Sequence, residues 1–335
     1  MARQKSGANA YERFVCRPLN YAGAGFFCSY VLGLLLSQLA QIPAFSMLSY
    51  VAGALSADSM LIGAVVGAAV VLAFDAAPLC VLCGAVAGTI GYSFAGLFTA
   101  IIAAYICTLM CLFVYGKTRA DVVLLPIVCT TGGVLCALLA APPLEMLYNL
   151  CAQALIHVSA WPSFLAYSCI AALAAFLSVT PISMFAIAAV LGDGTLSGAA
   201  FIGCCAAMVS FAAASYRENG MWIALSHALG TPRLQMGNIF GNPLILLCPL
   251  LSAALGGLAA GAFAFACPAA CVPQALTMLG GIVTLLTSTA QTQWLWTLLC
   301  VGVFTVAIPL VITIPLNRML YTTRAMQHGP MRVEL

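Results

Sequence analysis

Long apolar runs separated by short polar segments follow one another along almost the whole chain. Crossing a bilayer takes roughly 20 apolar residues in a helix. Runs that approach or exceed this length lie at residues 22–46, 60–74, 76–94, 97–115, 122–141, 163–190, 197–214, 244–266, 274–289 and 294–316. The pattern predicts an all-α polytopic membrane protein with about ten transmembrane helices.

Residues 142–162 follow a different pattern. Apolar side chains recur there at helical spacing, at Leu144, Leu147, Leu150, Ala154 and Leu155. Other faces of the same helix carry Glu145, Asn149, Gln153 and His157. Prolines bracket the segment, so the sequence predicts a separate amphipathic helix that lies in the membrane interface.

Composition and charge fit this interpretation, because 64% of the residues are hydrophobic and 6% are charged. Short cytoplasmic loops are enriched in Lys and Arg. Basic residues gather before the first run, between the fourth and fifth runs, and after the last run: Arg3, Lys5, Arg13 and Arg17; Lys117 and Arg119; Arg318, Arg324 and Arg332. An even number of crossings with both termini in the cytoplasm accommodates all three clusters.

Signatures of soluble enzymes are missing from the sequence. It contains no Walker loop, no GxSxG elbow, no HExxH motif and no dinucleotide fingerprint. Most of the 16 cysteines lie in apolar runs, where Cys behaves as a small hydrophobic residue. The three histidines lack the spacing of a zinc site. We therefore expect no cofactor, no metal, no nucleic-acid partner and no catalytic chemistry in this chain alone.

Polar side chains concentrate in residues 215–243, "SYRENGMWIALSHALGTPRLQMGNIFGNP". Glycines and prolines there interrupt any long helix. Non-helical backbone at membrane depth is tolerated where protein buries it or where it lines a watery cavity. These features are typical of a re-entrant hairpin or broken helix of the kind that forms transporter binding sites. An ordinary extramembrane loop has the same composition, and the pattern leaves both interpretations open.

A second interruption lies upstream, in "SVTPIS". Pro181 removes a helical hydrogen bond and frees a backbone carbonyl one turn earlier. The freed backbone and the hydroxyls of Thr180 and Ser183 provide a candidate wall for the same cavity. A proline kink satisfied by neighbouring helices is the alternative.

Three stretches together resemble a known family: "TPIS", "GCCAAMVSFAAASYRENG" from Gly203, and "ALGTPRLQMGNIFGNPLI" from Ala228. They resemble the membrane subunit IIC proteins of the bacterial sugar phosphotransferase system, in particular the stand-alone branch that includes perfringolysin regulator-like proteins. "PLNYAGAGFFCSYVLG" near the start is similar as well. The sequence departs from the family pattern at Pro232, Arg233, Gly237 and Gly241. Gly241 stands where a Lys is expected, so a cation has in effect moved to Arg233.

The resemblance implies ten membrane helices with re-entrant hairpins, a homodimer and a multi-pass location in the bacterial inner membrane. It also implies a division into a cytoplasmic tail (1–20), a scaffold and dimerisation half (21–160), a substrate-binding half (161–317) and a second tail (318–335). Phosphorylation of a sugar would require separate IIB and IIA proteins, because the chain carries no such domain.

The resulting hypothesis is a transporter that moves a sugar or sugar-derived small molecule, anionic compounds included, by alternating access. Gln235, Asn238 and Asn242 would hydrogen-bond hydroxyl groups, with Thr231, Thr180 and Ser183 in the same site. His227 and Glu218 would supply charge or exchange protons, and Arg233 would hold an anionic group. A membrane sensor that binds the same ligand without transport is the alternative.

Overall fold

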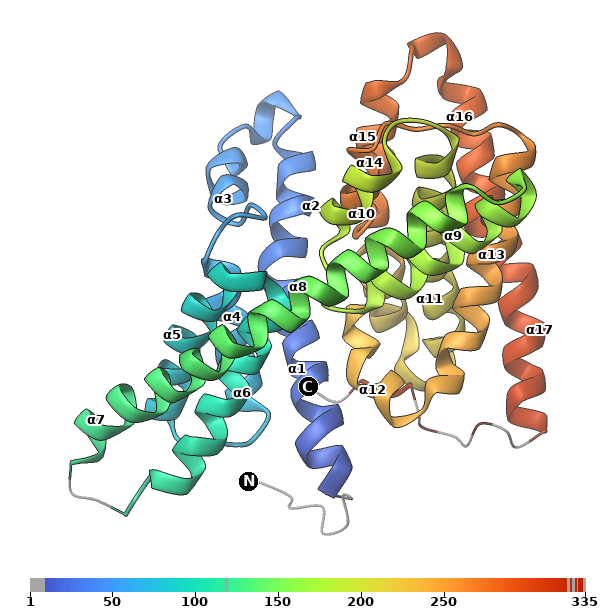
Figure 1. Cartoon of the computed structure of the whole chain (residues 1–335). Helices are drawn as coiled ribbons and strands as arrows, with labels where there is room; N and C mark the ends of the chain where they lie inside the picture. The colour runs from blue at the N-terminus through green and yellow to red at the C-terminus, as the bar shows by residue number, and fades with distance from the viewer. Residues whose placement is uncertain (1–9, 118–119, 324–325, 327–328, 330, 334–335) are drawn as a thin grey trace.

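The computed structural model describes residues 10–117, 120–323, 326, 329 and 331–333 (Figure 1). The basic residues Arg3, Lys5, Arg119 and Arg324 lie outside the described residues. Regular structure in the described part is helical, apart from one isolated antiparallel bridge between Gly194 and Cys267. The expected all-α fold is confirmed.

The first half consists of a long first helix, three packed helices and a connector. The first helix, Glu12–Leu39, contains η1 (Glu12–Cys16), α1 (Arg17–Phe26), η2 (Phe27–Val31) and α2 (Leu32–Leu39). There follow η3 (Pro43–Phe45), α3 (Leu48–Ala54), α4 (Leu61–Leu72), α5 (Pro78–Ala95), α6 (Leu97–Val114), α7 (Asp121–Leu124), η4 (Leu125–Thr130) and α8 (Thr131–Ser159).

Helices α4 and α5 pack closely because glycines line their contact. A side chain at Gly63, Gly67, Gly84 or Gly88 would overlap atoms of the facing helix. Small residues at such spacing let membrane helices approach each other and gain van der Waals contact, which is the main attraction available between helices in lipid. This contact builds the part of the first half against which the first helix packs.

The second half is made of helices that are interrupted repeatedly. It contains α9 (Ser163–Val179), α10 (Met184–Leu191), α11 (Thr195–Leu229), η5 (Pro232–Gln235), α12 (Met236–Gly241), η6 (Pro243–Leu246), α13 (Leu247–Ala262), α14 (Cys271–Gln274), α15 (Met278–Ser288), η7 (Gln291–Gln293), α16 (Trp294–Val301), η8 (Gly302–Ala307) and α17 (Ile308–Thr322). Helices α9, α11 and α13 pack together as the centre of this half (Figure 1).

Among the described residues, seven helices are long and apolar enough to span a membrane: Glu12–Leu39, Pro78–Ala95, Leu97–Val114, Asp121–Ser159, Thr195–Leu229, Pro243–Ala262 and Gln291–Thr322. Shorter apolar helices cover Leu61–Leu72, Ser163–Val179 and Met278–Ser288. Large apolar side chains such as Leu82, Phe113 and Leu295 are exposed, as expected of a surface that faces hydrocarbon. The number of crossings and the orientation stay predictions.

Helix α8 differs from the sequence-based prediction. The segment predicted as a separate interfacial helix continues the fifth apolar run without interruption, and Pro142 and Pro143 lie inside the helix. The prolines remove helical hydrogen bonds to Leu138 and Leu139, but the helix continues on both sides of them. The result is one long helix that crosses obliquely from the first half to the second (Figure 1).

The polar segment 215–243 is a series of short helical pieces. Helix α11 contains non-helical backbone at Gly220, with φ 74° and ψ −175°. The chain breaks again between α11 and η5, and at Asn242 between α12 and η6. The predicted broken helix is therefore present. Whether it forms a re-entrant hairpin in the membrane stays a prediction.

Candidate functional site

Three interruptions of the second half meet at one place. Residues 180–183 separate α9 from α10, residues 230–231 precede η5, and residues 275–277 separate α14 from α15. Hydroxyl groups hold two of the turns: Thr231 Oγ1 accepts a bond from Arg233 N at 3.4 Å, and Thr277 Oγ1 accepts one from Gly280 N at 3.1 Å. Residues at or directly after each interruption contribute to the wall of the same cavity: Ser183, Leu276 and, in the first turn of η5, Arg233.

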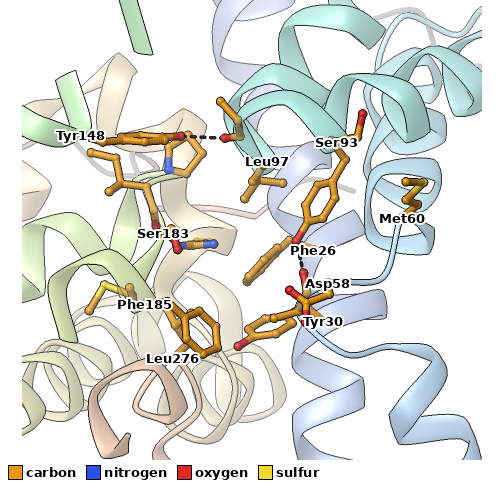
Figure 2. Close-up of a pocket in the computed structure, with 18 residues that line it drawn as sticks. Phe26, Tyr30, Asp58, Met60, Ser93, Leu97, Tyr148, Ser183, Phe185 and Leu276 are labelled. Carbon is orange, nitrogen blue, oxygen red and sulfur yellow. Dashed lines mark hydrogen bonds between the residues drawn. The ribbon is translucent and has the colours of Figure 1, made fainter. Parts of the chain in front are cut away.

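The cavity has a volume of about 780 Å³ and lies between the two halves of the molecule. Its lining consists of Phe26, Tyr30, Ala57, Asp58, Met60, Tyr92, Ser93, Ala95, Gly96, Leu97, Tyr148, Pro181, Ile182, Ser183, Met184, Phe185, Arg233 and Leu276. Figure 2 shows Tyr30, Asp58 and Met60 on one side, facing Ser183 and Phe185 on the other. Ligand sites are commonly found between domains and are mostly apolar with a few polar groups.

Arg233 is the most unusual residue in this wall, since it carries a charge and is only 2% exposed. Its Nε donates to the carbonyl of Ser178 at 3.1 Å, and its Nη2 donates to the carbonyl of Ile182 at 2.9 Å. The guanidinium carbon lies 4.3 Å from the centre of the Phe26 ring, a cation–π contact. The break around Pro181 thus supplies backbone oxygens that position the cation beside the cavity.

Arg233 retains unused hydrogen-bonding capacity. Within the described part of the chain it forms no ion pair, and its Nη1 has no hydrogen-bond partner. Tyr30 lines the same cavity, and its hydroxyl is buried and also has no partner among the described residues. Leaving such groups unpaired is costly. Arg233 Nη1 and the Tyr30 hydroxyl are therefore candidate donors for a ligand in this cavity.

Other polar groups in the wall are already bonded to backbone. Tyr92 Oη donates to the carbonyl of Ala57 at 2.7 Å, and Tyr148 Oη donates to the carbonyl of Ala95 at 3.0 Å (Figure 2). Their oxygens can still accept a bond from a ligand hydroxyl. Asp58 gives the cavity one acidic group, and it is exposed.

A second group of polar residues, which we call the amide cluster, consists of Asn20, His227, Gln235 and Asn238. Gln235 Nε2 lies 2.9 Å from His227 Nε2, and Asn238 Nδ2 donates to Gln235 Oε1 at 2.7 Å. Asn20 Nδ2 donates to Asn238 Oδ1 at 2.8 Å, while Asn20 Oδ1 accepts from Gly237 N at 2.8 Å. The amides therefore join the first helix to η5 and α12.

Backbone near the C-terminus completes this cluster. Gln235 Nε2 donates to the carbonyl of Met331 at 2.9 Å, and Asn238 Nδ2 donates to that of Arg332 at 3.1 Å. Glu218 accepts bonds from the hydroxyl of Tyr321 at 2.6 Å and from the backbone N–H of Met331 at 2.8 Å. These side chains are bonded to other parts of the protein.

A comparison with protein families adds to the geometry. The model of the family "Phosphotransferase system, EIIC" matches residues 17–333. The chain belongs to this family. Neither a curated protein nor a solved structure matches it. The family supports a membrane transporter of the phosphotransferase type, as the three quoted stretches predict, whereas the particular branch stays a prediction.

Two of the predicted site residues of this EIIC protein, Arg233 and Ser183, line the cavity. Thr180 Oγ1 donates to the carbonyl of Leu177 at the end of α9, and Asn242 Oδ1 accepts from Leu244 N at the start of η6. Thr231 holds the turn before Arg233. His227, Gln235 and Asn238 lie in the amide cluster, and Glu218 contacts the C-terminal residues. Their roles in binding stay predictions.

Sequence reasoning did not identify the contribution of the first half of the EIIC protein. Tyr30, Tyr92 and Tyr148 line the cavity, but each stands alone in an apolar or amphipathic helix, where nothing distinguishes it from a packing residue. Asn20 lies in the segment predicted as a tail. Its only distinguishing signal is its polarity, close to the start of the first apolar run.

Proposed function

We propose that this EIIC protein transports a sugar or a sugar-derived small molecule, and that the cavity between its halves is the binding site. The observation that carries the proposal is the pair of unused donors, Arg233 Nη1 and the Tyr30 hydroxyl, in a cavity of about 780 Å³. The volume lies in the usual range for small-molecule sites.

The substrate class includes anionic compounds such as sugar acids. A guanidinium without an acidic partner suits a carboxylate, because it can form charge-assisted hydrogen bonds that are stronger than those between neutral groups. Tyr30, Ser183 and the oxygens of Tyr92 and Tyr148 provide hydrogen bonds for hydroxyl groups. Asp58 on the opposite wall disfavours a second anionic group.

Alternating access would move residues 161–317 against residues 21–160, since the cavity lies between these two parts. Transporters with broken helices move one part of the fold against another around a central site. A homodimer through the first half, a bacterial inner-membrane location with cytoplasmic termini, and phosphotransfer from separate IIB and IIA proteins belong to the same proposal.

Uptake into proteoliposomes tests this function. The panel consists of neutral hexoses, hexuronates and hexose phosphates, each supplied with and without a purified IIB protein and its phosphoryl donor. Accumulation of a panel member by the parent chain, and none by empty liposomes, supports transport. Binding by calorimetry without accumulation would favour the sensor alternative. Neither binding nor accumulation of any compound would reject the proposed site.

Asp58→Asn provides a matched test of ligand charge. If the ligand is anionic, removing the acidic group from the cavity leaves its affinity unchanged or increases it. A loss of affinity in Asp58→Asn would contradict the anionic assignment and indicate that the acid, rather than Arg233, holds the ligand.

A further inference from the structure

Four polar side chains form hydrogen bonds to the backbone of residues near the C-terminus. We call Gly329 and residues 331–333 the C-terminal latch. Glu218 accepts from the N–H groups of Gly329 at 3.0 Å and Met331 at 2.8 Å. Asn219 donates to the carbonyl of Met331 at 2.6 Å and accepts from Val333 N at 2.8 Å. Gln235 and Asn238 bind the carbonyls of Met331 and Arg332.

One latch side chain supplies the apolar part of the contact. Met331 is 1% exposed and packs in a cluster that includes Val179, Phe211 and Ile245. Proteins recognise peptide segments by combining hydrogen bonds to the backbone, which provide affinity, with pockets for side chains, which provide selectivity. The four polar residues and this pocket therefore form a receptor for a short peptide segment, whose backbone turns between Gly329 and Arg332 through a bond from Arg332 N to the carbonyl of Gly329 at 3.2 Å.

The receptor joins two elements that the chain itself connects only through breaks. Glu218 and Asn219 belong to α11, whereas Gln235 belongs to η5 and Asn238 to α12. Non-helical backbone at Gly220 and the break before η5 lie between them. A bound latch ties η5 and α12 to the part of α11 that precedes Gly220, and with them Arg233, which lies two residues before Gln235 in η5.

The opposite side of η5 and α12 packs against the first helix. A side chain at Gly237 would collide with the carbonyl of Cys16, and one at Gly23 would collide with the carbonyl of Arg233. Cys16 is buried, and its sulfur lies 3.3 Å from the position that a Cβ on Gly241 would occupy. Displacement of α12 would expose this thiol.

We propose that the C-terminal latch forms a reversible contact that holds η5 and α12 against the first helix and keeps Arg233 in the cavity wall. Release of the latch frees this element to move, so the latch controls how readily the cavity changes shape. This role goes beyond transport itself, and it can be tested without any substrate. If the latch proposal fails, the transport proposal therefore still stands. If the transport proposal fails, the latch proposal still stands.

Alkylation of Cys16 by N-ethylmaleimide, followed by peptide mass spectrometry on the purified full-length protein, measures this movement. Glu218→Gln removes a charge that binds two latch N–H groups, and Met331→Asp removes the apolar contact. We expect each to raise the alkylation rate about tenfold or more, because hydrogen bonds to a charged group and a buried apolar side chain are strong contributors to a contact. Thr323→Ala is the matched control, since within the described residues its hydroxyl bonds to carbonyls of its own helix, those of Met319 and Leu320.

Hydrogen exchange and a peptide rescue exclude a general loss of folding. Exchange is expected to rise in residues 232–241 and to stay at the parent level in α13. The peptide GPMRVEL, added in excess to Met331→Asp, is expected to restore slow alkylation of Cys16, whereas the same peptide with Met331→Asp is not. Parent-level alkylation in both latch variants would overturn the proposal. So would an equal rise of exchange in α13, or failure of the peptide to restore protection.

Discussion

Arg233 lines the cavity, and Gln235, only two positions later in the chain, belongs to the amide cluster. Yet these two regions use the hydrogen-bonding atoms of their polar side chains in opposite ways. In the cavity, Arg233 Nη1 and the Tyr30 hydroxyl have no partner among the described residues. In the cluster, both polar atoms of the Gln235 and Asn238 amides are bonded to protein, and the atom without a partner among the described residues, His227 Nδ1, does not belong to an amide and lies outside the cavity wall. Density of polar residues therefore does not locate a ligand site. Unused hydrogen-bonding capacity beside a cavity is the better indicator.

The largest expected effect comes from Arg233→Gln, which removes the charged donor from the cavity wall. Loss of the charge removes the strongest contact with an anionic ligand, about 3 kcal/mol or on the order of 100-fold in affinity. Calorimetry with the ligand identified by uptake measures it. Arg233→Lys keeps the charge but has fewer N–H donors, so its ligand affinity should lie between that of the parent and that of Arg233→Gln. An unchanged Kd in a monodisperse Arg233→Gln preparation would show that the ligand binds elsewhere.

Gln235→Ala addresses the cluster side. It leaves His227, Asn238 and the carbonyl of Met331 each without one hydrogen-bond partner, so we expect a loss of about 2 kcal/mol in the free energy of unfolding. Ligand affinity should stay close to the parent value. Thermal unfolding and calorimetry on the same preparation separate the two quantities. Lost affinity with parent-like stability would instead support the sequence-based assignment of the amides as sugar ligands.

Local signals explain what the sequence predicted well. Gly and Pro constrain the backbone over a few residues, so the sequence alone suffices to place the breaks near Pro181 and in residues 215–243. The unusual Arg233 is found in the same way, from its surroundings and from its departure from the family pattern. Apolar runs identify the membrane helices for the same reason, because length and composition suffice.

Partners distant in sequence explain what the sequence could not provide. Gln235 and Met331 are 96 positions apart, and Asn20 and Asn238 are 218 positions apart. Nothing in the pattern around Gln235 indicates that its amide is already bonded. The three cavity tyrosines pose the converse problem, since a single Tyr in a helix has the same local pattern whether it packs or lines a cavity. Continuity of α8 through Pro142 and Pro143 likewise contradicts the local signal.

Tyr30→Phe tests the cavity side of the comparison again, and its expected effect is smaller than those of the two variants above. The Tyr30 hydroxyl has no hydrogen-bond partner in the described structure, so its removal costs the fold nothing in hydrogen bonds. We expect unchanged or slightly raised thermal stability and a loss of about 1 kcal/mol in ligand binding, roughly fivefold in Kd. Tyr92→Phe is the matched control, because it loses a bond to the carbonyl of Ala57 and should lose stability. Equal losses of stability in both variants would mean that the Tyr30 hydroxyl has a protein partner.

The smallest expected effect lies outside both regions, at the ion pair between Arg17 and Asp75. Arg17 Nη1 lies 2.8 Å from Asp75 Oδ2, and the two side chains are 35% and 74% exposed. The neighbouring guanidinium lowers the pKa of Asp75 below its usual range, through a hydrogen bond that outweighs the opposing effect of burial. A lowered pKa in the folded state adds stability at neutral pH, and this contribution disappears as the pH falls through that pKa.

Because solvent screens the pair, we expect Asp75→Asn to lower the free energy of unfolding by less than about 1 kcal/mol at pH 7 and by nothing measurable at acidic pH. Thermal unfolding at both pH values checks this, and a loss as large as that of Gln235→Ala would show that polar contacts at the exposed edge stabilise the protein as much as those in the buried cluster.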